Sequence, residues 1–335
     1  MIALPYLVFL GDADREVGVK TAQGVLHWRP DQVAGQFRMP GCELDLGIPD
    51  MDFDSAVAAG ARTVLIGIAN RGGILPERWI EPLRQALEAG LDIASGLHQR
   101  LSSFPVLKET ADRLGRQLHD VRHWSGPPIK LGTGEKRSGK RVLMAGTDCN
   151  IGKKYTALAV AHEMQARGFN ATFRATGQTG VLIAGQGVAI DAIPADFVSG
   201  AVEMLSPANA DDHWDVIEGQ ASVLHPFFGQ VTLGLVLGAQ PDALVLCHEA
   251  GRAHIRGMPH RPLPSLTATL EAHLAAARIN NPAVRAAAVS INTGGLSPDA
   301  AEAALEAAKA ETGLPATDPI RHGAGVLVDA ILAGR

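Results

Sequence analysis

Residues 141–167 contain the feature that most restricts the fold of this chain. The apolar run Val142–Ala145 is typical of a buried strand, and the apolar periodicity from Tyr155 onward predicts a helix that ends before Gly168. Between them lies a glycine-containing turn, Gly146–Gly152, with two lysines directly after it. In a phosphate-binding loop of this kind, backbone N–H groups and the helix N-terminus surround an anion that a lysine neutralises. The order of these parts therefore predicts an α/β domain of the P-loop type.

The residue after the first loop lysine departs from the usual pattern. Many phosphate loops place Ser or Thr there as a ligand for Mg²⁺, whereas this chain has Lys154. A second cation in place of a metal ligand favours a diphosphate held by lysines and weakens the case for ATP hydrolysis. We therefore expect no metal requirement, and we expect Lys153 to be exposed in the ligand-free loop. The residues predicted to bind the cofactor are Gly146, Thr147, Asp148, Cys149, Asn150, Ile151, Gly152, Lys153, Lys154, Tyr155 and Thr156.

Composition narrows the class of protein. A chain of 335 residues, 46% of them hydrophobic, is long enough for two domains with their own cores. The net charge of −5 and the lack of a long basic run argue against a nucleic-acid partner. No apolar stretch has the length of a membrane span, the apolar start lacks a signal-peptide pattern, and the three cysteines form no disulfide or zinc pattern. We expect a cytoplasmic homo-oligomer that acts on small molecules.

Alternating strand and helix patterns on both sides of a Gly-, Pro- and Lys-rich segment predict two parallel α/β domains. That segment, residues 126–140, is typical of a linker, so the domains are expected at residues 1–125 and 141–335. The expected strands are Tyr6–Leu10, Thr63–Ile68, Leu91–Ala94, Val142–Ala145, Ala171–Ala175, Trp214–Ile217, Ala243–Cys247 and Ala286–Asn292, and the expected helices are Pro76–Ala89, Pro105–Leu118, Tyr155–Arg167, Ala195–Leu205, Leu266–Arg278, Pro298–Glu311 and Gly325–Leu332.

Polar loops that follow the strands of the second domain are expected to converge on the phosphate loop. Ligands of open α/β sheets bind beyond the carboxyl ends of the strands. Glu218 ends a predicted buried strand and Gly219 would let a ligand approach, which predicts a general base. The alternative is an acid that caps a helix or pairs with an arginine. His225 is the second candidate base, and Asn292 is predicted to contact adenine or an oxyanion unless it is a buried structural amide.

Arginines in these loops are candidates for holding an acidic acceptor. A guanidinium group binds a carboxylate through two parallel hydrogen bonds, although a solvated basic loop would explain the same residues. The histidines at 248, 254 and 260 are spaced by six residues, which matches no common metal pattern. The turn at 176–180 is read as a polar turn that either touches the substrate or is an ordinary turn. The predicted substrate-binding residues are Arg71, Gln178, Thr179, Arg252, Arg256 and Arg321, and no metal ligand is predicted.

Two resemblances follow from these residues. Gly146-Thr147-Asp148 followed by Gly152-Lys153 resembles the phosphate loop of dethiobiotin synthetase and its relatives over residues 141–335, and Lys154 departs from that pattern. A closer resemblance covers nearly the whole chain through LGDADREVGVKTAQGVLHWRP, GIANRGG, GLHQRL, GTDCNIGKKYTA, RATGQTG, VIEGQAS and TDPIRHGAG. On these motifs the chain resembles the D-glutamate N-acetyltransferase family, long described as a domain of unknown function. The resemblance implies an N-terminal Rossmann-like domain, a C-terminal P-loop domain, and acetyl-CoA as donor to the amine of D-glutamate.

Three classes of function stay open at this point. Acetyl transfer agrees with the residues, because CoA carries a diphosphate, the acceptor ammonium must lose a proton, and the tetrahedral oxyanion needs hydrogen-bond donors. The first alternative is an ATP- and Mg²⁺-dependent ligase or kinase of the dethiobiotin-synthetase type. The second is a non-catalytic nucleotide-binding regulator. The chirality of the acceptor follows from the resemblance alone.

Overall fold

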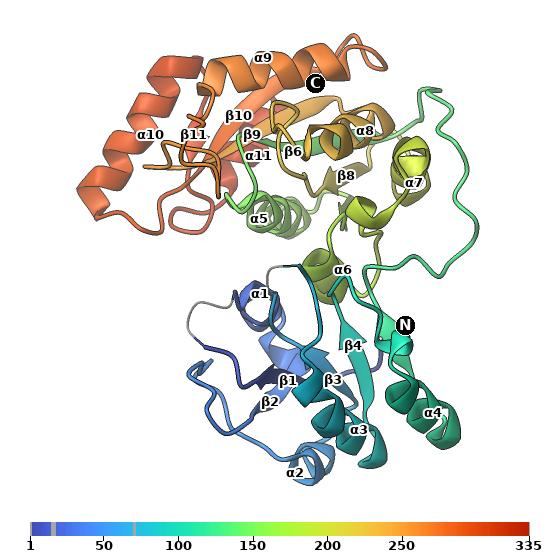
Figure 1. The fold of residues 1–335 in the computed structure, drawn as a ribbon. Helices are drawn as coiled ribbons and strands as arrows, with labels where there is room; N and C mark the ends of the chain where they lie inside the picture. The colour runs from blue at the N-terminus through green and yellow to red at the C-terminus, as the bar shows by residue number, and fades with distance from the viewer. Residues whose placement is uncertain (1, 15–17, 70–71, 335) are drawn as a thin grey trace. The chain divides into compact units, whose positions relative to one another are not determined.

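The computed structural model describes residues 2–14, 18–69 and 72–334, and it divides into two compact units (Figure 1). The first unit contains residues 1–126 together with 178–192, and the second contains 127–177 together with 193–335. No helix in the described part of the chain is long and apolar enough to cross a membrane.

The described residues of the first unit form a five-stranded parallel sheet in the order β2-β1-β3-β4-β5. All six residues of β1 are buried, as expected for a central parallel strand covered on both faces. The elements are β1 (Tyr6–Gly11), α1 (Lys20–Trp28), β2 (Val33–Arg38), α2 (Phe53–Ala58), β3 (Thr63–Ile66), α3 (Ile80–Glu88), β4 (Asp92–Ser95), α4 (Pro105–Leu114), β5 (Leu118–Asp120) and α6 (Gln178–Ala184).

The described residues of the second unit form a six-stranded parallel sheet in the order β11-β10-β9-β6-β8-β7. Because β6 lies between β9 and β8, the loop that follows β6 is flanked by the loops that follow those two strands. The elements are β6 (Lys140–Gly146), α5 (Lys153–Ala166), β7 (Ala171–Arg174), α7 (Val198–Leu205), β8 (Trp214–Ile217), α8 (Gly229–Ala239), β9 (Ala243–Glu249), α9 (Leu266–Ala277), β10 (Arg285–Asn292), α10 (Pro298–Thr312), β11 (Ala316–Thr317) and α11 (Gly325–Leu332).

The two parallel sheets confirm the predicted fold class, and most predicted elements are present with shifted ends. The helix predicted over Pro105–Leu118 is too long. It ends at Leu114 because Gly115 has a left-handed φ of 65° that caps the helix, and the last predicted helical residue begins β5.

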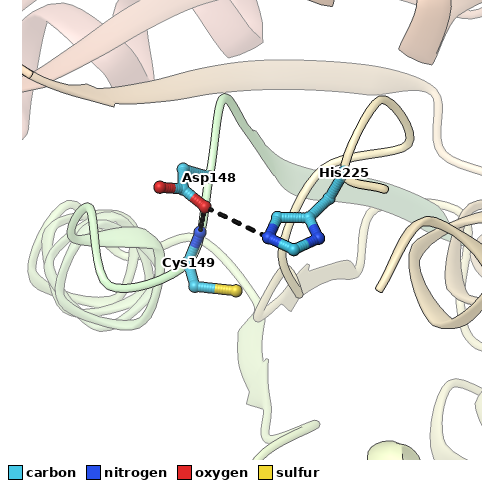
Figure 2. A group of neighbouring side chains, drawn as sticks. All are labelled: Asp148, Cys149 and His225. Atoms are coloured by element: carbon cyan, nitrogen blue, oxygen red, sulfur yellow. Dashed lines mark hydrogen bonds and ion pairs between the residues drawn. The ribbon is translucent and has the colours of Figure 1, made fainter. Parts of the chain in front are cut away.

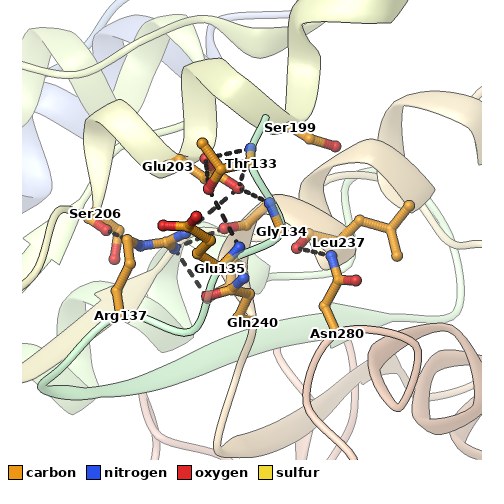
Figure 3. A network of polar contacts seen from close by, with 12 residues as sticks. Thr133, Gly134, Glu135, Arg137, Ser199, Glu203, Ser206, Leu237, Gln240 and Asn280 are labelled. Atoms are coloured by element: carbon orange, nitrogen blue, oxygen red, sulfur yellow. Dashed lines mark hydrogen bonds and ion pairs between the residues drawn. The ribbon is translucent and has the colours of Figure 1, made fainter. Parts of the chain in front are cut away.

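The segment before β6 contains no helix or strand but is attached to the second unit (Figure 3). The carboxylate of Glu203 on α7 accepts hydrogen bonds from Thr133 N, Gly134 N and the Thr133 hydroxyl at 2.9–3.1 Å. Gly200, also on α7, permits close approach, since a Cβ there would lie 1.8 Å from a carbonyl oxygen of this segment. The residues expected to form a linker therefore lie along α7.

The turn predicted at 176–180 is only partly a turn. Gln178 and Thr179 form the first turn of α6, which belongs to the first unit although it follows β7 in the chain. The Tyr6 hydroxyl donates to the Leu182 carbonyl at 3.3 Å, and the hydroxyls of Thr21 and Thr179 lie 3.3 Å apart. These bonds and the contact of α6 with α1 attach the helix to the first unit, a long-range outcome that the local sequence does not encode.

Candidate functional site

The phosphate loop has the backbone that its sequence predicts. It begins at the end of β6 and leads directly into α5. Asn150 and Gly152 adopt positive φ angles of 55° and 111°, a region that asparagine and glycine tolerate best. The first N–H groups of α5 have no carbonyl partner within the helix and carry partial positive charge. The loop and helix together therefore provide an anion-binding end to β6.

Lys153 is buried, with 6% of its surface exposed, so the expectation of an exposed lysine is wrong. Its Nζ donates to the backbone carbonyl of Asp148, across the loop. A Cβ on Gly146 would lie 2.9 Å from Nζ, so the absence of a side chain at Gly146 leaves the space that the lysine fills. Burial lowers the pKa of Lys153. A phosphate group would replace the carbonyl as the partner of this cation.

Lys154 and the two hydroxyl residues after it have different environments. Burial lowers the pKa of Lys154 to about 8, although the negative charge of Glu218 opposes the shift. Its Nζ lies 5.3 Å from the centre of the Tyr155 ring. Thr156, predicted to bind the cofactor, is buried, and its hydroxyl lies 2.8 Å from the Ser290 hydroxyl in the core. The hydroxyl of Thr156 therefore stabilises α5 against the sheet.

Asp148 connects the phosphate loop to its neighbours (Figure 2). Its side chain is completely buried. Oδ1 accepts from Cys149 N at 2.7 Å, and Oδ2 accepts from Arg252 Nη1 at 3.0 Å and from Arg256 N at 2.8 Å. His225 Nε2 lies 3.6 Å from Oδ1. The carboxylate thus holds the loops after β6 and β9 together.

The predicted carboxylate-binding arginines are largely committed to the protein. Arg252 also donates to the Cys149 carbonyl at 2.8 Å and forms an ion pair with Glu249. Arg321 donates to two backbone carbonyls of the loop after β10 at 3.0 and 3.2 Å. Arg71 lies outside the described residues. Arg252 therefore stabilises the phosphate loop through hydrogen bonds to Asp148 and Cys149.

The environment of Glu218 fits both interpretations of the sequence, a general base and an acid that caps a helix, because its carboxylate binds two N–H groups directly before α6. Glu218 is buried, and its Oε2 accepts from Thr176 N at 3.0 Å and Gly177 N at 3.1 Å. Burial raises the pKa of Glu218, while the charge of Lys154 lowers it. The predicted role of Gly219 is wrong, because a Cβ there would lie 1.6 Å from a carbonyl oxygen of β6. Gly219 provides room for the backbone of the sheet, and no space for a ligand.

Asp148, Cys149 and His225 offer ligand atoms that lie within 4.8 Å of one another, so we tested this cluster as a metal site. His225 Nδ1 accepts hydrogen bonds from Phe227 N and Phe228 N, both at 3.2 Å. An accepting Nδ1 leaves the ring proton of neutral histidine on Nε2, the nitrogen that faces Asp148. A metal at Nε2 would require that proton to move to Nδ1, against two N–H groups. The hydrogen bonds around His225 therefore disfavour a metal ligand at this position.

The structure brings Asn292 next to the phosphate loop. Its Cβ lies 3.7 Å from the position that a Cβ on Gly152 would occupy, at the end of β10. Its Oδ1 accepts from Gly294 N at 3.1 Å. Asn292 thus combines a structural hydrogen bond with a position suited to a ligand contact.

Two residues that help to build the site were not predicted from the sequence. Gln220 donates to both the carbonyl and the hydroxyl of Thr176 at 3.1 Å, and thereby supports the turn that binds Glu218. His248 Nδ1 lies 3.0 Å from the hydroxyl of Thr147 in the phosphate loop. His248 directly follows a predicted strand and Gln220 lies three residues after one, and that position is the signal that could have found them.

These features define a P-loop α/β protein with a second parallel-sheet domain, an anion-binding loop and a buried carboxylate beside it. The chain belongs to the DUF1611 family. Residues 130–328 match the family model described as "Domain of unknown function (DUF1611_C) P-loop domain". Residues 37–124 match the model described as "Domain of unknown function (DUF1611_N) Rossmann-like domain". These matches confirm the predicted pair of domain types.

Relatives align with the chain over nearly its whole length. A protein of Tritonibacter scottomollicae named D-glutamate N-acetyltransferase is 51% identical over 99% of this chain and 100% of its own length. A protein of Pseudoalteromonas sp with the same name is 43% identical over 98% of both chains. The crystal structure of a DUF1611 family protein from Anabaena variabilis is 33% identical, has a TM-score of 0.84, and covers 98% of this chain and 99% of that one. The family recognised in the sequence motifs is confirmed.

Proposed function

We propose that this protein is an N-acetyltransferase that moves the acetyl group of acetyl-CoA to the amine of D-glutamate. The observation that carries the proposal is the identity of 51% over 99% of the chain to a relative named D-glutamate N-acetyltransferase. The proposal includes a place in D-amino-acid breakdown, a cytoplasmic location and a homo-oligomeric state.

The proposed donor site is the phosphate loop. The diphosphate of CoA would lie against the N-terminus of α5, with Lys153 and Lys154 as its cations. The lysine in the place of the usual hydroxyl supports a donor that transfers no phosphoryl group and needs no Mg²⁺. Asn292, at the end of β10, is proposed to contact the nucleotide base or the oxyanion.

In the proposed reaction, Glu218 removes a proton from the ammonium group of the acceptor. The free amine then attacks the thioester carbonyl carbon, and the resulting oxyanion is stabilised by N–H donors. As the C–S bond breaks, the nitrogen loses its second proton and CoA leaves as a thiolate that takes up one of the two released protons. The other proton passes from Glu218 to solvent, so the products are N-acetylglutamate, CoA and one proton. A carboxylate with a raised pKa suits this step, because a base works best when its pKa approaches the working pH.

The acceptor carboxylates require a cation, and we propose Arg256 for the side-chain carboxylate. Its backbone N–H is bound to Asp148, which fixes the residue beside the phosphate loop. Within the described residues, the guanidinium of Arg256 has no assigned hydrogen bond, in contrast to those of Arg252 and Arg321. Arg256 is exposed, and glutamate should exceed glutamine and alanine in kcat/KM because only glutamate offers its guanidinium a side-chain carboxylate.

The test is to incubate the protein with acetyl-CoA and the D and L forms of glutamate, glutamine and alanine, and to follow release of free thiol. D-glutamate is expected to react fastest, with the same rate in EDTA and in added Mg²⁺. Equal rates for all acceptors would contradict the acceptor assignment. Release of ADP from ATP that depends strictly on Mg²⁺ would favour the ligase or kinase alternative.

A further inference from the structure

The side chain of His225 is held in one orientation at the wall of the phosphate loop. Only 4% of its side chain is exposed, and it lies in the loop between β8 and α8. Nδ1 accepts from Phe227 N and Phe228 N, both at 3.2 Å, as a side chain that caps a turn does. The opposite nitrogen, Nε2, faces Asp148 of the phosphate loop (Figure 2).

These two N–H donors determine the protonation state of the ring. Backbone N–H groups only donate, so Nδ1 must present its lone pair, and the single proton of the neutral ring resides on Nε2. A doubly protonated ring would place a third N–H against the two backbone N–H groups. Burial lowers the pKa of His225, which also keeps the ring neutral. With its proton on Nε2 and its lone pair turned away from the site, the ring has no basic nitrogen to offer a substrate.

We propose that His225 is a fixed, uncharged hydrogen-bond donor whose Nε2–H binds an oxygen atom of the molecule held in the phosphate loop, and that it is neither the general base nor a metal ligand. The distance of 3.6 Å from Nε2 to Asp148 Oδ1 exceeds the usual hydrogen-bond length, and that oxygen already accepts from Cys149 N. An N–H group in a buried place is stabilised by gaining an acceptor. A ligand oxygen beside Asp148 supplies one.

This inference rests on the proposed function for the identity of the ligand, acetyl-CoA. The oxygen that accepts from Nε2–H is either a phosphate oxygen or the thioester carbonyl oxygen of acetyl-CoA. A phosphate contact acts in both ground and transition states, so its loss weakens binding of acetyl-CoA. A carbonyl contact becomes stronger as the oxyanion forms, so its loss lowers kcat.

The first test observes the ring itself and needs no activity. Two-bond ¹⁵N–¹H correlation spectra of the ¹⁵N-histidine-labelled full-length protein report which ring nitrogen carries the proton, and the His225 signals are those that disappear in His225→Asn. We expect a protonated Nε2 and an unprotonated Nδ1 at pH 7.5 in the ligand-free protein. A proton on Nδ1, or a signal shift on addition of Zn²⁺ that removes the Nε2 proton, would overturn the proposal.

The second test uses two substitutions that each keep one end of the ring. In His225→Asn the amide oxygen takes the place of Nδ1 and preserves the turn, but the donor at the position of Nε2 is lost. In His225→Gln the amide N–H₂ reaches the place of Nε2 and preserves the donor, although neither amide is basic. We expect His225→Asn to lower kcat/KM for acetyl-CoA on the order of 100-fold, because loss of either contact lowers kcat/KM. Gln is expected to restore activity to within about tenfold of the wild type.

Each outcome of the second test has a defined meaning. If His225→Gln is as inactive as His225→Asn while circular dichroism shows both variants folded, the ring acts as a base and the proposal fails. A loss in kcat assigns the carbonyl oxygen, and a loss in acetyl-CoA affinity assigns a phosphate oxygen. His162→Asn, an exposed histidine on α5, is the matched control and should leave activity unchanged. If the wild-type protein transfers no acetyl group, acetyl-CoA binding by calorimetry replaces kcat/KM, and the spectra still decide the tautomer.

Discussion

Two buried carboxylates flank the phosphate loop, and their surroundings are opposite. Asp148 uses both oxygens for donors of the protein, among them the guanidinium of Arg252. Glu218 binds two N–H groups through Oε2 alone, and within the described residues no donor is assigned to Oε1. A saturated carboxylate stabilises structure, whereas one with an uncommitted oxygen can accept a proton. The comparison indicates that the number of bound donors distinguishes Asp148, a structural carboxylate, from Glu218, the candidate general base.

The strongest test of this comparison is Glu218→Gln, which keeps the shape and removes the proton acceptor. We expect kcat to fall by about 100-fold or more, as loss of a general base does. Steady-state kinetics of acetyl transfer to D-glutamate measure it, and thermal unfolding should show a fold close to that of the wild type. An unchanged kcat would make Glu218 structural, and the two carboxylates would then share one role.

The converse substitution, Asp148→Asn, is expected to act mainly on stability. The substitution removes the charge of a buried carboxylate that binds Arg252, and because Glu249 remains as a second partner of that arginine, the cost should be on the order of 1–3 kcal/mol. Urea unfolding of the full chain measures this loss. Arg252→Lys is the matched variant, which keeps the charge, loses the guanidinium geometry and should cost less. An unchanged free energy of unfolding in Asp148→Asn would show that Asp148 has no structural role.

Lys153→Ala tests whether the loop between the two carboxylates binds the donor. We expect the affinity for acetyl-CoA to fall by about 10- to 100-fold, as for a lost hydrogen bond to a charged group. The buried carbonyl of Asp148 would lose its donor, so the free energy of unfolding should also fall by about 1–3 kcal/mol, and circular dichroism must show that the variant is folded. Isothermal calorimetry measures the affinity. The same dissociation constant in both proteins would exclude Lys153 from the donor site.

The smallest expected effect is the pH dependence of donor binding through Lys154. Its pKa of about 8 means that the amine loses its charge as pH rises through this value. A bound anion favours the charged form, so affinity should be constant below about pH 7 and fall about tenfold by about pH 9. Calorimetry at several pH values checks the slope, and Lys154→Met should remove it. This pH dependence bears on the comparison of the two carboxylates, because the negative charge of Glu218 raises the pKa of Lys154 and opposes the effect of burial.

Much of the fold was predictable from local patterns. The strand at Trp214–Ile217 and the helix at Gly325–Leu332 were predicted with the bounds that the structure has, because continuous apolar runs and apolar periodicity are strong local signals. Placement of α6 was not predictable, since its apolar residues would fit either sheet. The extent of Pro105–Leu118 was overpredicted, because the helix pattern continues past the glycine that ends it.

The sequence by itself determined the anion-binding loop, the strand on which Glu218 stands and the family to which the chain belongs. These properties depend on backbone preferences and on the spacing of apolar residues, which short segments encode. Only the tertiary structure decided that Lys153 is buried, that Arg252 binds the phosphate loop and that His225 Nδ1 accepts from two backbone N–H groups. Asp148 and Arg252 are 104 residues apart in the chain. Which donor meets which acceptor depends on how distant segments pack, and no local pattern records that pairing.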